Sequence, residues 1–182
     1  MGRGKLGLGM GKVSRLSGLA TIGYEGVSLP AFLATLKAAG VTLLLDVREL
    51  PISRRKGFSK TALSNALSRV GIGYQHERAL GAPRSVRHRL REDGNLKRYF
   101  ADFREYLSTQ DTLLDELARA LSGCVALLCF ERNPAECHRS VVVAALARRL
   151  KTGFLHLSVA QRDAQQKSAH ARTHPRQGIP AT

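Results

Sequence analysis

The chain has 182 residues, of which 43% are hydrophobic, and its formal net charge is +15 at pH 7. A hydrophobic share of this size can form a core, which excludes a wholly disordered chain, and the length is typical of one domain. No run of about 18 apolar residues occurs, so the sequence predicts no transmembrane segment. The basic excess favours an anionic partner: nucleic acid, a phosphorylated small molecule or an anionic membrane surface.

The cysteine content and the N-terminal sequence indicate a cellular compartment. Three cysteines are too few for a disulfide framework, and this favours a reducing environment. The first 18 residues are basic but lack the continuous apolar stretch of a secretory signal. Together these features predict a cytoplasmic protein.

The two ends of the chain differ in composition from its middle. Residues 1–18 contain six glycines and four basic residues with no acidic one, which predicts a flexible basic arm. Residues 161–182 are polar and have no hydrophobic period, which predicts a disordered tail. The expected folded domain therefore spans residues 19–160.

The first half of this domain alternates short apolar runs with helical patterns. A strand is expected at 19–23, followed by a helix that Ser28 can cap and that carries Pro30 in its first turn. The continuous apolar run 41–47 predicts a strand covered on both faces. After a basic loop, the sequence predicts a second helix beginning near residue 59 and a weaker strand at 72–76.

In the second half, residues 80–95 combine glycines, a proline and many arginines, and predict a loop with at most a helical turn. Helical spacing follows over 96–121 and is interrupted near 108–110. A buried strand at 124–130, a helix at 138–150 and a final strand at 154–157 complete the pattern. Strands that alternate with helices favour a single three-layer α/β domain, with a mostly parallel sheet flanked by helices.

Polar side chains follow several of the predicted strands. In an open α/β sheet, ligands bind beyond the carboxyl ends of the strands, so these side chains are expected to share one edge. The residues expected to support a site there are Tyr24, Asp46, Tyr74 and His76.

The segment from Cys129 to Arg139 carries the candidate catalytic groups. Cys137 precedes a predicted helix beside cationic residues, and both the helix dipole and positive charge favour a thiolate. We therefore expect Cys137 or Cys129 to act as a nucleophile and Glu131 or His138 to move protons. A zinc site built from the two cysteines and His138 is a weaker alternative, because no paired Cys-x-x-Cys is present, so no metal is expected. Buried, purely structural cysteines are the other alternative.

Basic residues near the same edge are expected to bind an anion. Arg139, in the first turn of a predicted helix, can bind a phosphate or carboxylate through both guanidinium arms. Asp46 can orient Arg48 toward a ligand, and the alternative is an internal ion pair that only shapes the loop. Residues 48–91 contain 11 basic and 2 acidic residues, a net charge of +9. The expected anion contacts are Arg48, Arg54, Arg55 and Arg139.

Several short motifs follow one another in a fixed order: Thr21-Ile22-Gly23, Asp46-Val47-Arg48, Cys129-x-Glu131 and Cys137-His138-Arg139. Together they resemble the family called domain of unknown function 488. The resemblance covers about residues 20–150. It implies a three-layer α/β domain of the kind found in small bacterial proteins, and it implies no activity. Tyr24 and Glu25 stand where the family commonly has a small hydroxylic residue, and 82–95 is richer in arginine, which puts a common substrate in doubt.

Three functions remain open at the level of the sequence. The first is an enzyme that acts on a phosphate-bearing substrate through the residues above. The second is a nucleic-acid-binding module without catalysis, in which arginines of 84–91 contact phosphates. The third rests on a loose resemblance of residues 45–49 to rhodanese-type domains, which implies a rhodanese- or phosphatase-like enzyme with Cys129 as nucleophile. No Walker loop or dinucleotide-binding glycine motif occurs, and the sequence leaves the identity of any cofactor open.

Overall fold

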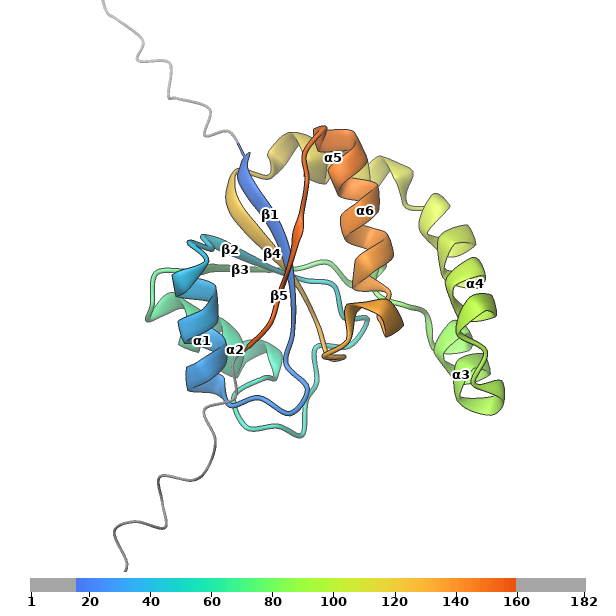
Figure 1. Cartoon of the computed structure of the whole chain (residues 1–182), viewed down its shortest axis with the longest axis horizontal. Helices are drawn as coiled ribbons and strands as arrows, with labels where there is room; N and C mark the ends of the chain where they lie inside the picture. Colours follow the sequence, from blue (N-terminus) through green and yellow to red (C-terminus); the bar gives the residue numbers. More distant parts are fainter. Residues whose placement is uncertain (1–15, 160–182) are drawn as a thin grey trace, which may run out of the picture.

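A five-stranded sheet lies between two layers of helices in the computed structural model of this protein, which describes residues 16–159 (Figure 1). Every strand pair is parallel, and the strand order is β3-β2-β4-β1-β5. The expected α/β class is therefore confirmed. The first strand begins at residue 16, so residues 16–18 of the expected arm belong to it, whereas residues 1–15 and the expected tail lie outside the described residues. The strands are β1 (Leu16–Gly23), β2 (Leu43–Asp46), β3 (Gly73–His76), β4 (Gly123–Cys129) and β5 (Leu155–Leu157).

Two helices, α1 (Leu29–Ala38) and α2 (Lys60–Ser68), cover one face of the sheet. Ser28 caps the first of them as predicted, because its hydroxyl oxygen accepts a hydrogen bond from the Ala31 amide at 3.4 Å. Alternate strand residues turn toward these helices, as the period of two requires, and form one half of the core. This half includes Ile22, Leu44 and Leu128 of the strands and Phe32, Leu36, Leu63 and Leu67 of the helices.

The opposite face is covered by α4 (Leu96–Ser108), α5 (Asp111–Ala120) and α6 (Arg139–Leu150). The interruption expected near 108–110 is confirmed, because α4 ends there and α5 begins directly afterwards. The intervening strand residues form the second half of the core with these helices. It includes Leu45, Val125 and Leu127 of the strands and Phe103, Leu114 and Leu146 of the helices.

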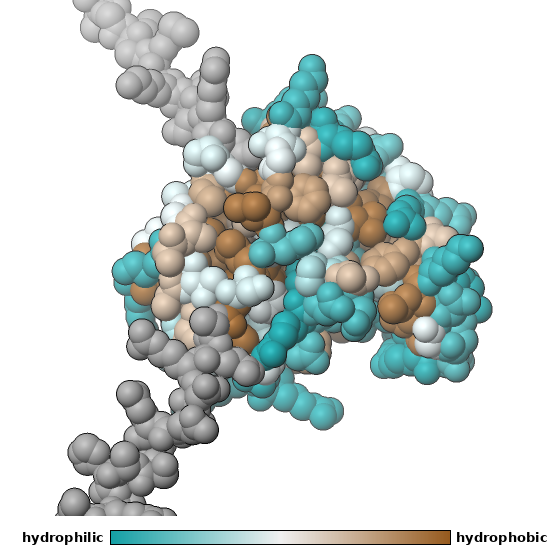
Figure 2. Space-filling model, in the orientation of Figure 1, coloured by the Kyte–Doolittle hydropathy of each residue, from teal (hydrophilic) through white to brown (hydrophobic). Residues whose placement is uncertain are grey.

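The prediction of a loop at 80–95 is wrong, because this segment contains the end of the short helix η1 (Arg78–Leu80) and the regular helix α3 (Arg84–Asp93). Arginine is a good helix former, and its abundance indicates solvent exposure rather than irregular backbone. Gly94, with φ at +63°, ends α3 in the left-handed conformation that favours glycine. Val86 anchors the helix in the core, while the outer side of α3 and α4 is hydrophilic (Figure 2).

The topology creates a crevice beyond the carboxyl end of β4. The chain leaves β1 and β2, the neighbours of β4, toward α1 and α2 on one face, whereas it leaves β4 toward α6 on the other. Connections that diverge in this way leave a gap in which α/β sheets bind ligands. Within residues 16–159, no helix has the length and apolar character needed to cross a bilayer.

Candidate functional site

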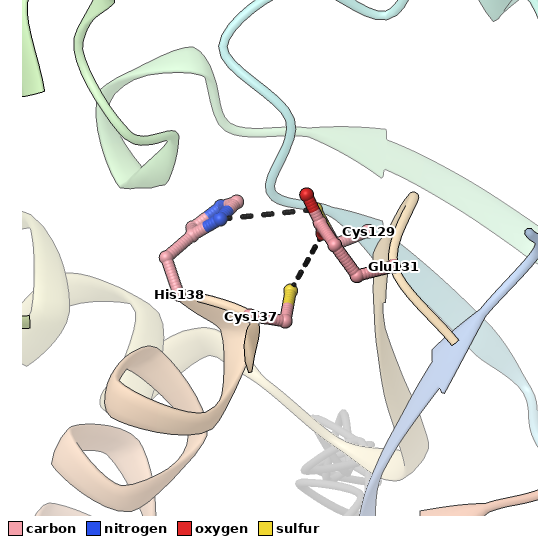
Figure 3. A group of neighbouring side chains, drawn as sticks. All are labelled: Cys129, Glu131, Cys137 and His138. Carbon is pink, nitrogen blue, oxygen red and sulfur yellow. Dashed lines mark hydrogen bonds between the residues drawn. The ribbon is translucent and has the colours of Figure 1, made fainter. Parts of the chain in front are cut away.

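Four titratable side chains converge at the end of β4. Cys129 is the last residue of β4, Cys137 and His138 stand directly before α6, and Glu131 lies in the connection between them. Figure 3 shows the four side chains pointing toward one common point. One ligand atom from each of the four lies within 4.8 Å of every other. The structure thus brings together all four residues expected to carry chemistry.

Hydrogen bonds fix the orientation of these groups. Both thiols, of Cys129 and Cys137, donate to the same Glu131 oxygen, Oε2, at 2.9 Å. The His138 ring has Nε2 at 2.8 Å from the Val47 carbonyl oxygen and Nδ1 at 3.7 Å from the Cys129 sulfur. A carbonyl only accepts, so Nε2 carries the proton, and the lone pair of the neutral ring is on Nδ1. This lone pair faces the sulfur.

The activated thiolate expected at Cys137 is not favoured by this environment. Its side chain is fully buried, and this burial, reinforced by the neighbouring Cys129, raises the pKa of the thiol well above its usual range. Burial alone would raise the pKa of Glu131 as well, but hydrogen bonds from the two thiols lower it below its usual value. The carboxylate therefore remains ionised, and its negative charge lies beside the protonated Cys137 thiol.

The same geometry argues against Cys129 as a rhodanese-like nucleophile. The side chain is 3% exposed, and its sulfur lies 2.9 Å from a Glu131 carboxylate oxygen. A nucleophilic cysteine of that class needs a positive environment and an accessible sulfur. Cys129 is enclosed beside an anion, so it resembles a buried or ligating cysteine more than an attacking one.

Asp46 and Arg48 form an internal ion pair, which is the alternative to an Arg48 that faces a ligand. The Arg48 Nε and Nη2 atoms donate to the two Asp46 carboxylate oxygens at 2.8 and 2.5 Å, and both residues are buried. Burial alone would lower the pKa of Arg48, but its hydrogen bonds with Asp46 and the attraction of that carboxylate raise it. The remaining arm donates to the Tyr24 hydroxyl and the Phe58 carbonyl, both at 2.9 Å. The fork therefore has protein partners in place of the expected anion.

The other expected supports complete this network. The Tyr74 hydroxyl donates to Asp46 Oδ2 at 2.6 Å, and His76 Nε2 lies 2.9 Å from the Arg48 carbonyl oxygen. Burial, with the added effect of Asp46, raises the pKa of Tyr74 and keeps its hydroxyl protonated. Tyr24, Tyr74 and His76 therefore hold Asp46 and Arg48, which in turn hold the loop that leads to α2.

Arg139 likewise has internal partners where an anion contact was expected. Its side chain is 1% exposed and runs back from α6 toward β1. It donates to the carbonyl oxygens of Glu131 at 2.5 Å and Arg132 at 3.0 Å, and to the Thr21 hydroxyl at 3.3 Å. These bonds fix the connection that carries Glu131, so Arg139 positions this part of the cluster without being one of its four members.

Gly23, at the end of β1, is a positioning residue that sequence reasoning did not single out for this role. A Cβ atom at this position would lie within 1.9 Å of the Glu131 carbonyl oxygen. Only glycine permits so close an approach of the two backbones. The signal in the sequence is the glycine that closes the first apolar run, but its partner lies more than a hundred residues away.

A cleft of about 880 Å³ opens at the same edge of the sheet. Cys129, Glu131 and His138 contribute to its wall. Four of the five exposed large hydrophobic side chains among the described residues line this cleft, and they come from three separate segments. They are Leu50, Ile52, Leu96 and Phe130.

Arginines also line this cleft, among them Arg54 and Arg55 of the expected set. Arg55 donates to the Val27 carbonyl oxygen at 2.5 Å. Arg54 is exposed, as is Arg91 of α3, and neither guanidinium has a hydrogen bond or ion pair with any residue in 16–159. Arg91 was missed as a site residue because the sequence predicted no helix that would carry it to the cleft.

The carboxylates in the wall of the cleft are already engaged. Glu49 pairs with Arg87, and Glu25 accepts a hydrogen bond from the Arg132 amide at 3.0 Å. Glu136 accepts from the Asn133 side chain at 2.7 Å. The free cationic groups of the cleft are therefore available to a ligand.

Comparison with known proteins gives one match. A family model described as "Domain of unknown function DUF488" matches residues 28–146, well over half of the chain. The matched range contains all four residues of the cluster, the Asp46–Arg48 pair and α3. No curated protein and no solved structure gives a significant match.

Proposed function

We propose that this chain, which belongs to the family of the domain of unknown function DUF488, binds a phosphate-bearing small molecule in the cleft at the carboxyl edge of its sheet. One observation carries the proposal. Two exposed guanidiniums, those of Arg54 and Arg91, have no hydrogen bond or ion pair with residues 16–159. They line the same cleft from separate segments, the connection before α2 and the helix α3. Guanidinium groups match the geometry of phosphate oxygens and can bind them through two parallel hydrogen bonds.

The rest of the cleft supports a ligand that also has an apolar or planar part. Its volume of about 880 Å³ lies within the usual range for small-molecule sites. Exposed Phe130, Ile52 and Leu50 offer an apolar surface beside the guanidiniums. A nucleotide combines a planar base with phosphates, and therefore matches both features.

Nucleic acid is the less favoured ligand, because part of the basic surface of α3 is already neutralised. Arg87 pairs with Glu49, and Arg89 pairs with Asp102 at 3.1 Å. Only Arg84 and Arg91 of this helix then remain for a phosphate backbone. Tight nucleic-acid binding depends on many neutralised phosphates, and two are few for such an interface.

Titration of the full chain with fluorescently labelled adenosine diphosphate tests the proposal. We expect saturable binding, and we expect the double variant Arg54→Ala/Arg91→Ala to weaken it at least ~10-fold, because each charge-assisted hydrogen bond lost contributes about 1.5–3 kcal/mol. Fluorescence anisotropy at constant salt measures the dissociation constant.

The matched control is Arg69→Ala/Arg84→Ala, which removes the same charge from α3 and the end of α2. Both residues are exposed and lie outside the cleft. The control should bind labelled adenosine diphosphate as the wild type does. Equal weakening in the two double variants would refute a specific site. Preference for a single-stranded oligonucleotide, with a steep salt dependence, would replace the small molecule with nucleic acid.

A further inference from the structure

We propose that Cys129, Glu131, Cys137 and His138 together bind one zinc ion. The set offers two sulfurs, one imidazole nitrogen and one carboxylate oxygen, which are the donor types that Zn²⁺ prefers and the number that a tetrahedral site requires. This site goes beyond ligand binding in the cleft, and its presence does not depend on that binding.

The distances agree with a tetrahedral site that closes on an ion. Bonds of about 2.0–2.3 Å to a tetrahedral zinc ion would separate the ligand atoms by roughly 3.3–3.8 Å. Here the Cys129 sulfur lies 3.7 Å from His138 Nδ1, and each sulfur lies 2.9 Å from Glu131 Oε2. Hydrogen bonds from the thiols account for the two shorter separations, so each of these would lengthen by roughly 0.4–0.9 Å to admit the ion.

The groups behind the cluster hold the ligands in the required orientation. Metal-binding histidines usually donate their second ring N–H to a carbonyl or carboxylate, and His138 Nε2 is 2.8 Å from the Val47 carbonyl oxygen. This bond leaves Nδ1 as the nitrogen that faces the sulfurs. The connection carrying Glu131 is fixed by Arg139 and by the close approach of its backbone to Gly23.

A change of backbone conformation explains how two adjacent residues serve one ion. Cys137 is extended, with φ −121° and ψ 132°, whereas His138 is already helical, with φ −56° and ψ −24°. Side chains of adjacent residues in a strand would point to opposite sides, but this turn into α6 directs both toward Glu131 and Cys129. Figure 3 shows the resulting convergence. The pattern contains no Cys-x-x-Cys, so its spacing alone indicates a zinc site only weakly.

The binding step balances as an exchange of protons for metal. The thiols of Cys129 and Cys137 release one proton each to solvent as their sulfurs form bonds to Zn²⁺. Ionised Glu131 supplies an electron pair without losing a proton. His138 supplies the Nδ1 lone pair of its neutral form, and a ring that is charged first releases its Nδ1 proton to solvent. Three of these residues also line the cleft, so the ion would lie in its wall.

The experiment is metal analysis of the purified full chain after incubation with zinc sulfate and removal of unbound metal. We expect one zinc per chain in the wild type and only trace zinc in Cys137→Ser. Cys124→Ser is the matched control, because Cys124 lies on the same strand as Cys129 and its sulfur contacts the Ala39 carbonyl instead of the cluster. It should retain zinc at the wild-type level.

A second measurement needs no variant and therefore does not depend on the folding of Cys137→Ser. Replacement of zinc by cobalt in the wild type should produce intense visible bands of tetrahedral Co²⁺ and a thiolate-to-cobalt charge-transfer band in the near-ultraviolet. A wild-type chain that takes up no metal, cobalt spectra without thiolate bands, or a Cys129–Cys137 disulfide formed in place of metal binding would each overturn the proposal. Zinc uptake without binding of labelled adenosine diphosphate would refute the proposed function and leave the zinc site standing.

Discussion

Replacement of Asp46 by asparagine is expected to lower the free energy of unfolding by about 3–5 kcal/mol, the usual effect of removing one partner of a buried ion pair. The Arg48 guanidinium is 5% exposed and would retain its charge without a counter-ion. The Asp46 carboxylate accepts four hydrogen bonds, three from Arg48 and one from the Tyr74 hydroxyl. Asparagine preserves the shape of the side chain but presents an N–H group to these donors.

Urea denaturation of the full chain, followed by circular dichroism, measures this change. Asp111→Asn is the matched control, because it removes one carboxylate from an ion pair with Arg149 in which Asp111 is 64% exposed. Exposed pairs contribute about 0–1 kcal/mol, so the control should unfold near the wild-type midpoint. A loss below about 1 kcal/mol for Asp46→Asn would show that water compensates the unpaired arginine.

The double variant Asp46→Leu/Arg48→Met separates charge from packing. Buried ion pairs that are replaced by apolar residues of similar volume often lose little stability, since the desolvation of both charges disappears. We therefore expect the double variant to be more stable than Asp46→Asn. It should still be less stable than the wild type, because Tyr24, Tyr74 and the Phe58 carbonyl lose their partner.

Local patterns were sufficient to predict most of the fold. The apolar runs at 41–47 and 124–130 identified the two central strands, because a strand covered on both faces needs apolar residues at every position. The glycines, proline and arginines of 80–95 predict a loop, but residues 84–93 form a helix. The feature that favours a helix over a loop in this segment is the spacing of Val86 and Leu90, which pack inward one turn apart.

The sequence predicted which residues form the site, but not whether the arginine side chains beside it point toward a ligand or toward the interior. Strand ends and a helix start indicated Cys129, Glu131, Cys137 and His138, and these do converge. The partners of Arg48 include the Phe58 carbonyl and the Tyr24 hydroxyl, which no spacing rule links to it. An arginine beside a strand end can face a ligand or the interior, and contacts distant in sequence decide between them.

Arg139→Met is expected to lower the free energy of unfolding by about 2–4 kcal/mol and to loosen the connection between β4 and α6. Methionine retains the apolar stem but removes every donor. The carbonyl oxygens of Glu131 and Arg132 then lose their partner, and unsatisfied buried groups cost about 1–3 kcal/mol each. Arg139→Lys should not restore stability, because a single ammonium group cannot reach three acceptors that a planar fork reaches together.

Two measurements distinguish this positioning role from a simple loss of packing. Amide hydrogen exchange should become faster over residues 130–138 in Arg139→Met, beyond the change caused by the lower global stability. Arg149→Met removes the same groups from the same helix, but its ion-pair partners Asp111 and Asp115 are exposed. That control should lose about 1 kcal/mol or less and leave exchange at 130–138 unchanged. Faster exchange spread evenly over the domain would instead mean that Arg139 stabilises the fold as a whole, without a particular hold on the segment that carries Glu131.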